Sequence, residues 1–183
     1  MLTHTHAHPG DSGYTTLTHG SRTRKDAPLL AAHGELDEAG TALGAAASSG
    51  CLPEQFDALL RDTQQTLFHL GRSLLEEDSP PETAALEELE AVCQRYAREP
   101  LPDEPTVLAS RSTTVTHLLW ARAVTRRAER TLWTFVLDEQ HPPLRYAAVT
   151  LNRLADVLML AAALLHRGVI QEFPLGICGG ATA

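Results

Sequence analysis

The sequence predicts an all-α fold, a bundle of five helices preceded by an irregular N-terminal arm. Hydrophobic residues make up 43% of the 183 residues and aromatic residues 5%, and an apolar content rich in Ala and Leu favours packed helices over a β-sandwich. From Leu29 onward apolar residues recur at helical spacing, and Pro or Gly residues separate the runs. The length suits one domain with its own core, so we expect a single bundle over residues 29–168.

The arm and the first two helices follow in order. Residues 1–28 are rich in Thr, His, Gly and Ser without a sustained period, which predicts an irregular arm. The first helix ends at the Ser48-Ser49-Gly50 sequence, and its apolar stripe is Leu29, Ala32, Leu36, Ala39, Leu43 and Ala46. Pro53 opens the second helix, where its missing N–H is tolerated, and this helix ends in the acidic residues before Pro80.

Three further helices complete the predicted bundle. The third covers about residues 82–98 and is expected on the outside of the bundle, with a Pro-rich link after it. The fourth covers about residues 113–140, where two prolines stop it, and the fifth covers residues 143–167 and is capped by Gly168. Residues 169–183 are apolar and Gly-rich with no clear element, so we expect a flexible C-terminal tail.

Charge and cysteine content exclude several classes of function. A net charge of −8 is opposite to the basic surface that nucleic-acid-binding domains use. The three cysteines lie far apart and form no C-x-x-C pair, which is typical of reduced thiols in a cytoplasmic protein. The longest apolar run, residues 157–165, is too short to span a bilayer. We therefore expect no nucleic-acid partner, no membrane and a cytoplasmic location.

The arm contains a candidate anion site. Gly10 and Gly13 lie in the sequence Gly-Asp-Ser-Gly-Tyr-Thr-Thr, and the cations Arg22 and Lys25 follow. Glycines let backbone N–H groups turn toward an anion, hydroxyls add donors, and the cations add charge. By this pattern alone the segment is either a phosphate cradle or an ordinary surface turn.

Two predicted helices carry polar groups in apolar surroundings. In the fourth helix one face holds Arg122, Arg126 and Glu129, and this face is either solvated with surface ion pairs or part of a site. The fifth helix has three polar residues within a run of Leu, Val and Met, namely Asn152, Arg153 and Asp156. Polar groups in so apolar a setting are expected to be paired or to hold a ligand.

The histidines near the N-terminus have two interpretations. His4, His6 and His8 alternate, so an extended segment would place them on one side, where they could bind a transition metal. The other interpretation is a disordered N-terminal arm. The remaining histidines are scattered and are expected on the surface or in core packing.

Five motifs follow one another along the chain: G-D-x-G-x-T, R-x-x-K-D-x-P, H-G-x-x-D-E, R-x-x-x-R-R-A-E-R and L-N-R-L-x-D. In this order they resemble the motifs of the PduO-type ATP:cob(I)alamin adenosyltransferases. The resemblance covers about residues 9–167, and its most specific parts are residues 126–130 and 151–156. It implies the five-helix fold of that family.

The resemblance implies an ATP site. In the family the glycine-containing arm wraps the triphosphate, which assigns phosphate contacts to Gly10, Asp11, Ser12, Gly13, Thr15, Thr16, Arg22 and Lys25. Arg126 would face ATP, with Glu129 orienting it and Asn152 beside the nucleotide or the corrin. The family is also trimeric, with sites at subunit interfaces, and an aspartate of its first helix pairs across the boundary with an arginine. That pair would be Asp37 and Arg122.

The implied reaction is attack of the Co(I) of reduced cobalamin on C5′ of ATP, with triphosphate as the leaving group. Cationic groups that stabilise charge building on the leaving group are the natural catalytic contribution. Arg126 and Lys25 are the implied catalytic residues, with Arg22 supporting them and Mg²⁺ bound to the phosphates.

The chain departs from the family pattern mainly on the corrin side. His8 replaces a lysine of the arm, Gly40 replaces an asparagine, and Thr106 replaces a phenylalanine that helps displace the lower ligand of cobalamin. The first hypothesis is therefore an adenosyltransferase acting on cobalamin or a related corrinoid. The alternatives are a relative that keeps the ATP site but uses another acceptor, and a non-catalytic protein that binds a nucleotide or a corrinoid.

Overall fold

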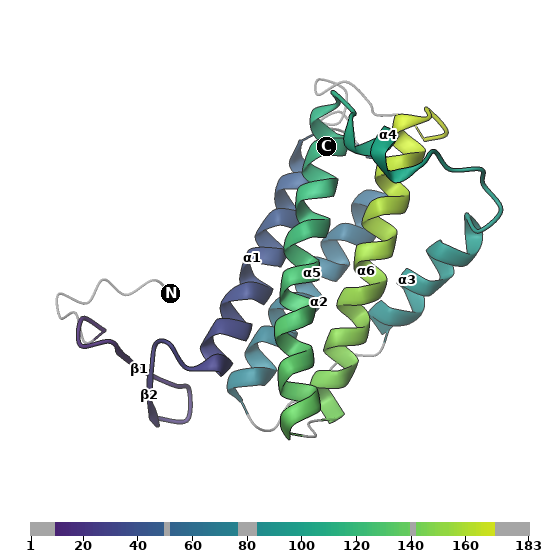
Figure 1. Ribbon diagram of the computed structural model, residues 1–183. Coiled ribbons are helices and arrows are strands. Elements are labelled where there is room, and N and C mark those ends of the chain that lie inside the picture. Colours follow the sequence, from purple (N-terminus) through teal and green to yellow (C-terminus); the bar gives the residue numbers. More distant parts are fainter. Residues whose placement is uncertain (1–9, 50–51, 77–83, 140–141, 171–183) are drawn as a thin grey trace, which may run out of the picture.

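The computed structural model describes residues 10–49, 52–76, 84–139 and 142–170, which form a helical bundle with a small hairpin beside it (Figure 1). The helices are α1 (Pro28–Ser48), α2 (Glu54–Leu75), α3 (Ala84–Arg95), the short α4 (Glu104–Leu108), α5 (Thr113–Glu139) and α6 (Pro142–His166). The prediction of a mainly helical fold with five substantial helices is confirmed.

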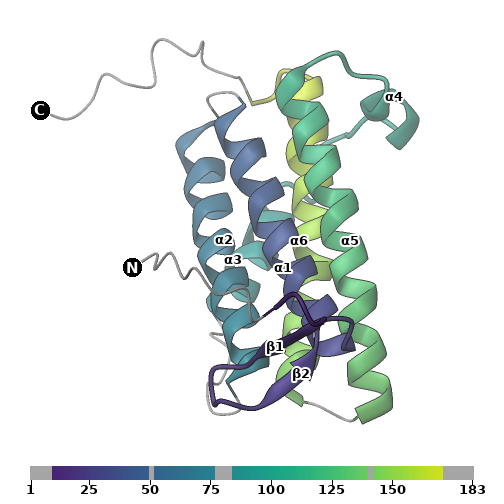
Figure 2. The same ribbon diagram turned by 90° about the vertical axis from the view of Figure 1, so that its left-hand side faces the viewer.

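The helices form a four-membered bundle with a fifth helix on its flank. α1 packs against both α2 and α5, α5 packs along α6, and α2 meets α6, so the order around the bundle is α1, α2, α6, α5 (Figures 1 and 2). α3 lies against α6 and α2 from outside, where the sequence analysis expected it. α1 and α5 consequently lie side by side on one face of the bundle, with the hairpin in front of its lower part (Figure 2).

Leucine and alanine build the core. The largest fully buried side chains are mostly leucines from α1, α2, α5 and α6, including Leu36, Leu43, Leu60, Leu67, Leu118, Leu132, Leu151, Leu154, Leu158 and Leu164. Burying one such side chain contributes about 1.5–3 kcal/mol. Alanines fill the remaining buried positions and allow the helix axes to approach closely, as at Ala161, Ala162 and Ala163 of α6.

α6 is the most apolar helix. Residues Leu144–His166 are long and apolar enough, by length and composition, to cross a membrane. However, 61% of the tested window is buried inside the bundle, which is typical of the core helix of a water-soluble bundle. The stretch is longer than the uninterrupted apolar run noted in the sequence because it includes the polar residues 152, 153 and 156.

The arm is more regular than the sequence analysis predicted. β1 (Tyr14–Thr16) pairs antiparallel with β2 (Arg22–Arg24), with Thr15 opposite Thr23. The hairpin lies beside the N-terminal end of α1 (Figure 2). The Thr18 hydroxyl donates a 3.1 Å hydrogen bond to the Leu75 carbonyl at the end of α2, so the loop of the hairpin is attached to the bundle.

The Pro-rich link also contains an element that the sequence analysis did not predict. Asp103 caps α4 by accepting a hydrogen bond from the Thr106 N–H at 3.2 Å, and Pro105 occupies a first-turn position where no donor is needed. The other helix ends lie within a few residues of their predicted positions. Gly168 ends α6 with a φ of 68°, as a helix-capping glycine does.

Candidate functional site

The turn at the start of the arm brings glycines and a cation together. The Gly13 N–H donates to the Gly10 carbonyl at 3.2 Å, and Gly13 has a φ of 78°, which a glycine adopts without strain. The Lys25 N–H donates to the Gly13 carbonyl at 2.9 Å. The Lys25 side chain crosses Gly10, where an added Cβ would lie 2.6 Å from its Nζ. Gly10 therefore leaves room for the lysine, and the ammonium group lies over the turn.

Arg22 supplies a second cation to the same turn. Its guanidinium donates to the Ser12 hydroxyl at 2.9 Å and lies 5.1 Å from the centre of the Tyr14 ring, a cation–π distance. Sequence reasoning did not assign a role to Tyr14. Asp11, Ser12 and Gly13 are exposed, as are Arg22 and Lys25. In β1, Thr15 is half-buried and Thr16 is exposed.

The neighbouring arginine differs from these two cations. Arg24 donates to both carboxylate oxygens of Asp26, at 2.8 and 2.5 Å. These hydrogen bonds hold the pKa of Asp26 below its usual value. The charge of Arg24 is therefore neutralised within the arm, whereas Arg22 and Lys25 face the glycine turn. Two cations, hydroxyls and a turn with exposed backbone are suited to a polyanion such as a chain of phosphates.

On α5 the candidate residues form a separate group. Arg126 is exposed, and its carbonyl accepts a 2.9 Å hydrogen bond from Arg130. Glu129 accepts a hydrogen bond from the Trp133 indole N–H at 3.2 Å, so within one chain its partner is Trp133 rather than Arg126. The hairpin lies beside the N-terminal end of α1 (Figure 2), whereas Arg126 is midway along the sequence of α5.

Asp37 and Arg122 do not pair within one chain. Asp37 lies on α1 with its side chain 56% exposed, and its Oδ2 is 3.8 Å from Nε2 of His33. Arg122 lies on α5 with its side chain 23% exposed, and it forms a 3.0 Å ion pair with Glu104 of α4.

Two other contacts between α1 and α5 were not foreseen. Glu38 forms an ion pair with Arg127, and this pairing raises the pKa of the arginine. The Glu35 carboxylate accepts a 2.8 Å hydrogen bond from Thr131. The partners are 89 and 96 residues apart in sequence. No local sequence pattern therefore predicts these two contacts.

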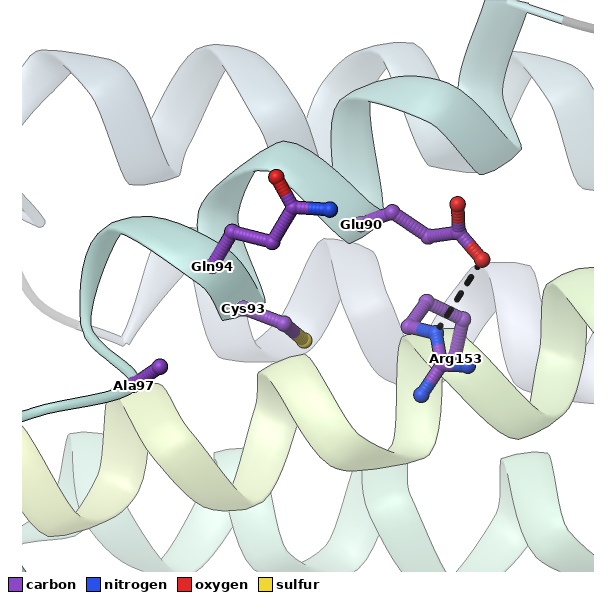
Figure 3. Close-up of a pocket in the computed structure, with 5 residues that line it drawn as sticks. All are labelled: Glu90, Cys93, Gln94, Ala97 and Arg153. Carbon is purple, nitrogen blue, oxygen red and sulfur yellow. Dashed lines mark ion pairs between the residues drawn. The ribbon is translucent and has the colours of Figure 1, made fainter.

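Of the polar residues of α6, some are exposed on the surface and one lies beside a cavity. Asn152 is exposed, whereas Arg153 donates to Asp156 at 2.7 Å and approaches Glu90 of α3 at 3.7 Å. A cavity of about 370 Å³ lies between α3 and α6 beside this ion pair, and Cys93 lines it (Figure 3). Burial raises the pKa of the Cys93 thiol, so the thiol stays protonated near neutral pH. None of the predicted ATP contacts lines this cavity.

The positions that depart from the family pattern are also defined. Gly40 is buried, and an added Cβ would lie 3.9 Å from Cγ of Gln64 of α2, which is an ordinary van der Waals distance. Thr106 is exposed in the first turn of α4. His4, His6 and His8 lie outside the described residues. Within the described ranges, no three His, Cys, Asp or Glu side chains gather in a group able to hold a metal ion.

Comparison with known proteins gives one consistent result. The sequence model of the family described as "Cobalamin adenosyltransferase" matches residues 5–165. A corrinoid adenosyltransferase of Mycobacterium tuberculosis (strain H37Rv) is 34% identical over 173 residues, covering 87% of this chain and 86% of the relative. The corrinoid adenosyltransferase of Mycobacterium leprae is 32% identical, with 91% and 93% covered.

A solved structure has the same fold. It is a phenylalanine-to-alanine variant of the PduO-type ATP:corrinoid adenosyltransferase from Lactobacillus reuteri, complexed with cobalamin and ATP. It superposes with a TM-score of 0.73 at 25% identity, covering 91% of this chain and 96% of that chain.

Proposed function

Because this chain belongs to the cobalamin adenosyltransferase family, we propose that it transfers the 5′-deoxyadenosyl group of ATP to reduced cobalamin or a related corrinoid. Family membership defines the reaction class, and the roles of individual residues form the rest of the proposal. The observation that carries it is the arm, where Lys25 and Arg22 converge on the Gly10–Gly13 turn.

We assign the triphosphate of ATP to this turn. Gly10, Asp11, Ser12, Gly13, Thr15 and Thr16 would surround the phosphates with backbone and hydroxyl donors. Lys25 and Arg22 would supply positive charge through charge-assisted hydrogen bonds. The pairing of Arg24 with Asp26 supports this division of roles, because only one of these three cations is already neutralised by a carboxylate of the arm.

The chemistry requires stabilisation of a leaving group. The Co(I) electron pair forms a bond to C5′, the bond between C5′ and the triphosphate oxygen breaks, and triphosphate leaves with that electron pair. Negative charge grows on the leaving oxygen in the transition state, so fixed cations nearby lower the barrier. We assign this catalytic role to Lys25 and Arg126, with Glu129 and Asn152 as further ATP contacts from the helices.

We propose that the site is completed between subunits of a homotrimer. The exposure of Asp37 supports this, because its side chain is 56% exposed and its ion pair within the described chain is a 3.8 Å contact with His33. Asp37 of one copy would pair with Arg122 of the partner subunit. Arg122 would then exchange or share its present partner, Glu104.

Mg²⁺ belongs to the proposal as a companion of ATP. Magnesium prefers oxygen ligands and is commonly bound through substrate phosphates, so we expect it to enter the site on the triphosphate. There it would neutralise part of the charge on the leaving group. We also place the enzyme in the cytoplasm, where its thiols would remain reduced.

The residues expected near the corrinoid support a second candidate function. Thr106 is a small, exposed residue where the family pattern has a phenylalanine, and Gly40 lacks the amide side chain of that pattern. A relative that retains the ATP site but adenosylates another nucleophile is therefore the alternative to a corrinoid enzyme.

An anaerobic assay tests the proposal. Chemically reduced cob(I)alamin, ATP and Mg²⁺ are mixed with the wild type, Lys25→Ala or Arg126→Ala, and adenosylcobalamin is followed by its absorbance. We expect turnover by the wild type and a large loss in both variants. No turnover by the wild type while ATP still binds would favour the alternative acceptor. Failure of the wild type to bind ATP in calorimetry would contradict the assignment of the arm.

A further inference from the structure

His33 is a half-buried histidine of α1 held against α2. Its side chain is 26% exposed and lies on Gly71, a buried residue of α2. A Cβ at Gly71 would lie 2.9 Å from Nδ1 and 3.4 Å from Cε1 of the ring. The ring can occupy this place because residue 71 has no side chain, so Gly71 sets how the imidazole is oriented.

The position of the ring indicates which nitrogen carries the proton. Nδ1 is buried and has no hydrogen-bond partner among the described residues. A buried N–H without an acceptor is rarer and less favourable than a buried acceptor without a donor. The neutral ring is therefore protonated at Nε2. Nε2 is the atom that faces Asp37, at 3.8 Å from Oδ2. His33 thus presents a donor to that carboxylate.

Asp37 differs from the other acids of this segment. Glu35 accepts a hydrogen bond from Thr131, and Glu38 pairs with Arg127, so both are engaged by α5 of the same chain. Asp37 lies on the opposite flank of α1, beside α2, and its ion pair within the described chain is the one with His33. Its side chain is more than half exposed and faces outward. His33 is therefore the group that can fix the direction of this carboxylate.

We propose that His33 is a positioning residue for the junction between subunits. Its Nε2–H donates to Asp37 and directs the carboxylate toward Arg122 of the partner subunit. The distance of 3.8 Å is too long for a hydrogen bond in the single chain, and it shortens when the arginine of the second copy orders Asp37. This inference rests on the proposed pairing of Asp37 and Arg122 across subunits.

A double-mutant cycle tests the inference. His33→Leu keeps an apolar side chain against α2 but removes the donor, and we expect a roughly tenfold weaker association of subunits by sedimentation equilibrium, with a higher KM for ATP. In an Asp37→Asn background the same substitution should have little further effect. His33→Gln places an amide donor near the position of Nε2 and should restore most of the association.

Two further variants separate positioning from packing. Gly71→Ala displaces the ring without removing it, so it should weaken association in the same way as His33→Leu. His69→Leu is the matched control, because His69 is an exposed histidine of α2 that contacts Phe68 edge-on, and it should change neither association nor KM. Thermal unfolding at fixed protein concentration verifies that each variant folds.

The possible failures are distinguishable. If His33→Leu weakens association equally with and without Asp37, or if His33→Gln fails to restore it, the histidine serves packing alone and the inference is overturned. The proposed shared site would still stand on the separate effects of Asp37→Asn and Arg122→Ala. If those two variants assemble and bind ATP as the wild type does, the intersubunit pair itself is wrong, and the inference fails with it.

Discussion

The arm and the α4 segment are both short elements outside the long helices, but their polar groups are arranged differently. In the arm, Lys25 and Arg22 converge on a glycine turn in which Asp11, Ser12 and Gly13 are exposed. In α4, the Thr106 N–H is bonded to Asp103, and Glu104 is paired with Arg122 of α5. The two cations of the arm therefore lie at an exposed turn, whereas the polar groups of α4 are bonded within α4 and to α5. Substitutions in the two regions should accordingly affect different properties.

The largest expected effect is on the chemical step. Arg126→Ala should lower the rate with supplied cob(I)alamin by about 10²-fold or more, because one contact that stabilises the transition state is lost. The exposed position of Arg126 predicts unchanged thermal stability. Arg145→Ala, an exposed arginine near the start of α6, is the control and should keep full activity. Full activity of the Arg126 variant would contradict the proposed contact between α5 and the triphosphate.

ATP affinity provides the next test. Lys25→Ala should weaken ATP binding in calorimetry by about tenfold to a hundredfold, since a hydrogen bond to a charged group contributes about 1.5–3 kcal/mol. The matched control is Arg24→Ala, because Arg24 is an adjacent cation already paired with Asp26. We expect a much smaller loss there. Equal losses in the two variants would mean that the arm acts through its net charge rather than through the glycine turn.

Substitutions at Thr106 of α4 should change how the corrinoid acceptor is activated. In the family pattern a phenylalanine at this place helps displace the lower ligand of cobalamin, so Thr106→Phe should accelerate turnover by about tenfold when Co(II) must first be reduced. The gain should be smaller with Co(I) supplied. Thr106→Val, which replaces the hydroxyl with a methyl group but adds no aromatic ring, should show no gain. Identical gains in both assays would place the effect after the reduction step.

The smallest expected effect is on stability. Asp103→Ala removes the side-chain cap of α4 and should lower the free energy of unfolding by about 1 kcal/mol in urea titration, with ATP affinity unchanged. Asp103→Asn retains a capping side chain and should remain close to the wild type. A loss of ATP affinity in the alanine variant would show that α4 and the arm are coupled, and the comparison between them would then fail.

The long helices were predictable because each carries its own periodic signal. The stripe through Leu36 and Leu43, and the Pro or Gly residues between runs, located them within a few residues. The two missed elements were short, and their signals were local and weak. Asp103 with Pro105 has the pattern of a capped helix start, and the β-branched residues Thr15 and Thr23 fit a hairpin, but Gly and Pro nearby favoured loops.

The candidate site was only partly predictable for a different reason. The arm residues are close in sequence, so the meeting of Lys25 with Gly10 follows from a local turn. The pairing of Glu38 with Arg127 depends on how α1 packs on α5, which no short motif encodes. The predicted pairing of Asp37 with Arg122 requires a second copy, and a single chain gives each residue a local partner instead.

The apolar character of α6 has a consequence for how the chain is made. Synthesis proceeds from the N-terminus, so α1, α2, α3 and α5 emerge from the ribosome before α6 does. Their apolar faces are then available to receive Leu151, Leu154 and Leu158 as soon as these emerge. A segment that resembles a membrane span is thus exposed to chaperones and bilayers for the shortest part of biosynthesis. Circular permutation that moved α6 to the front would lengthen that exposure and should favour aggregation.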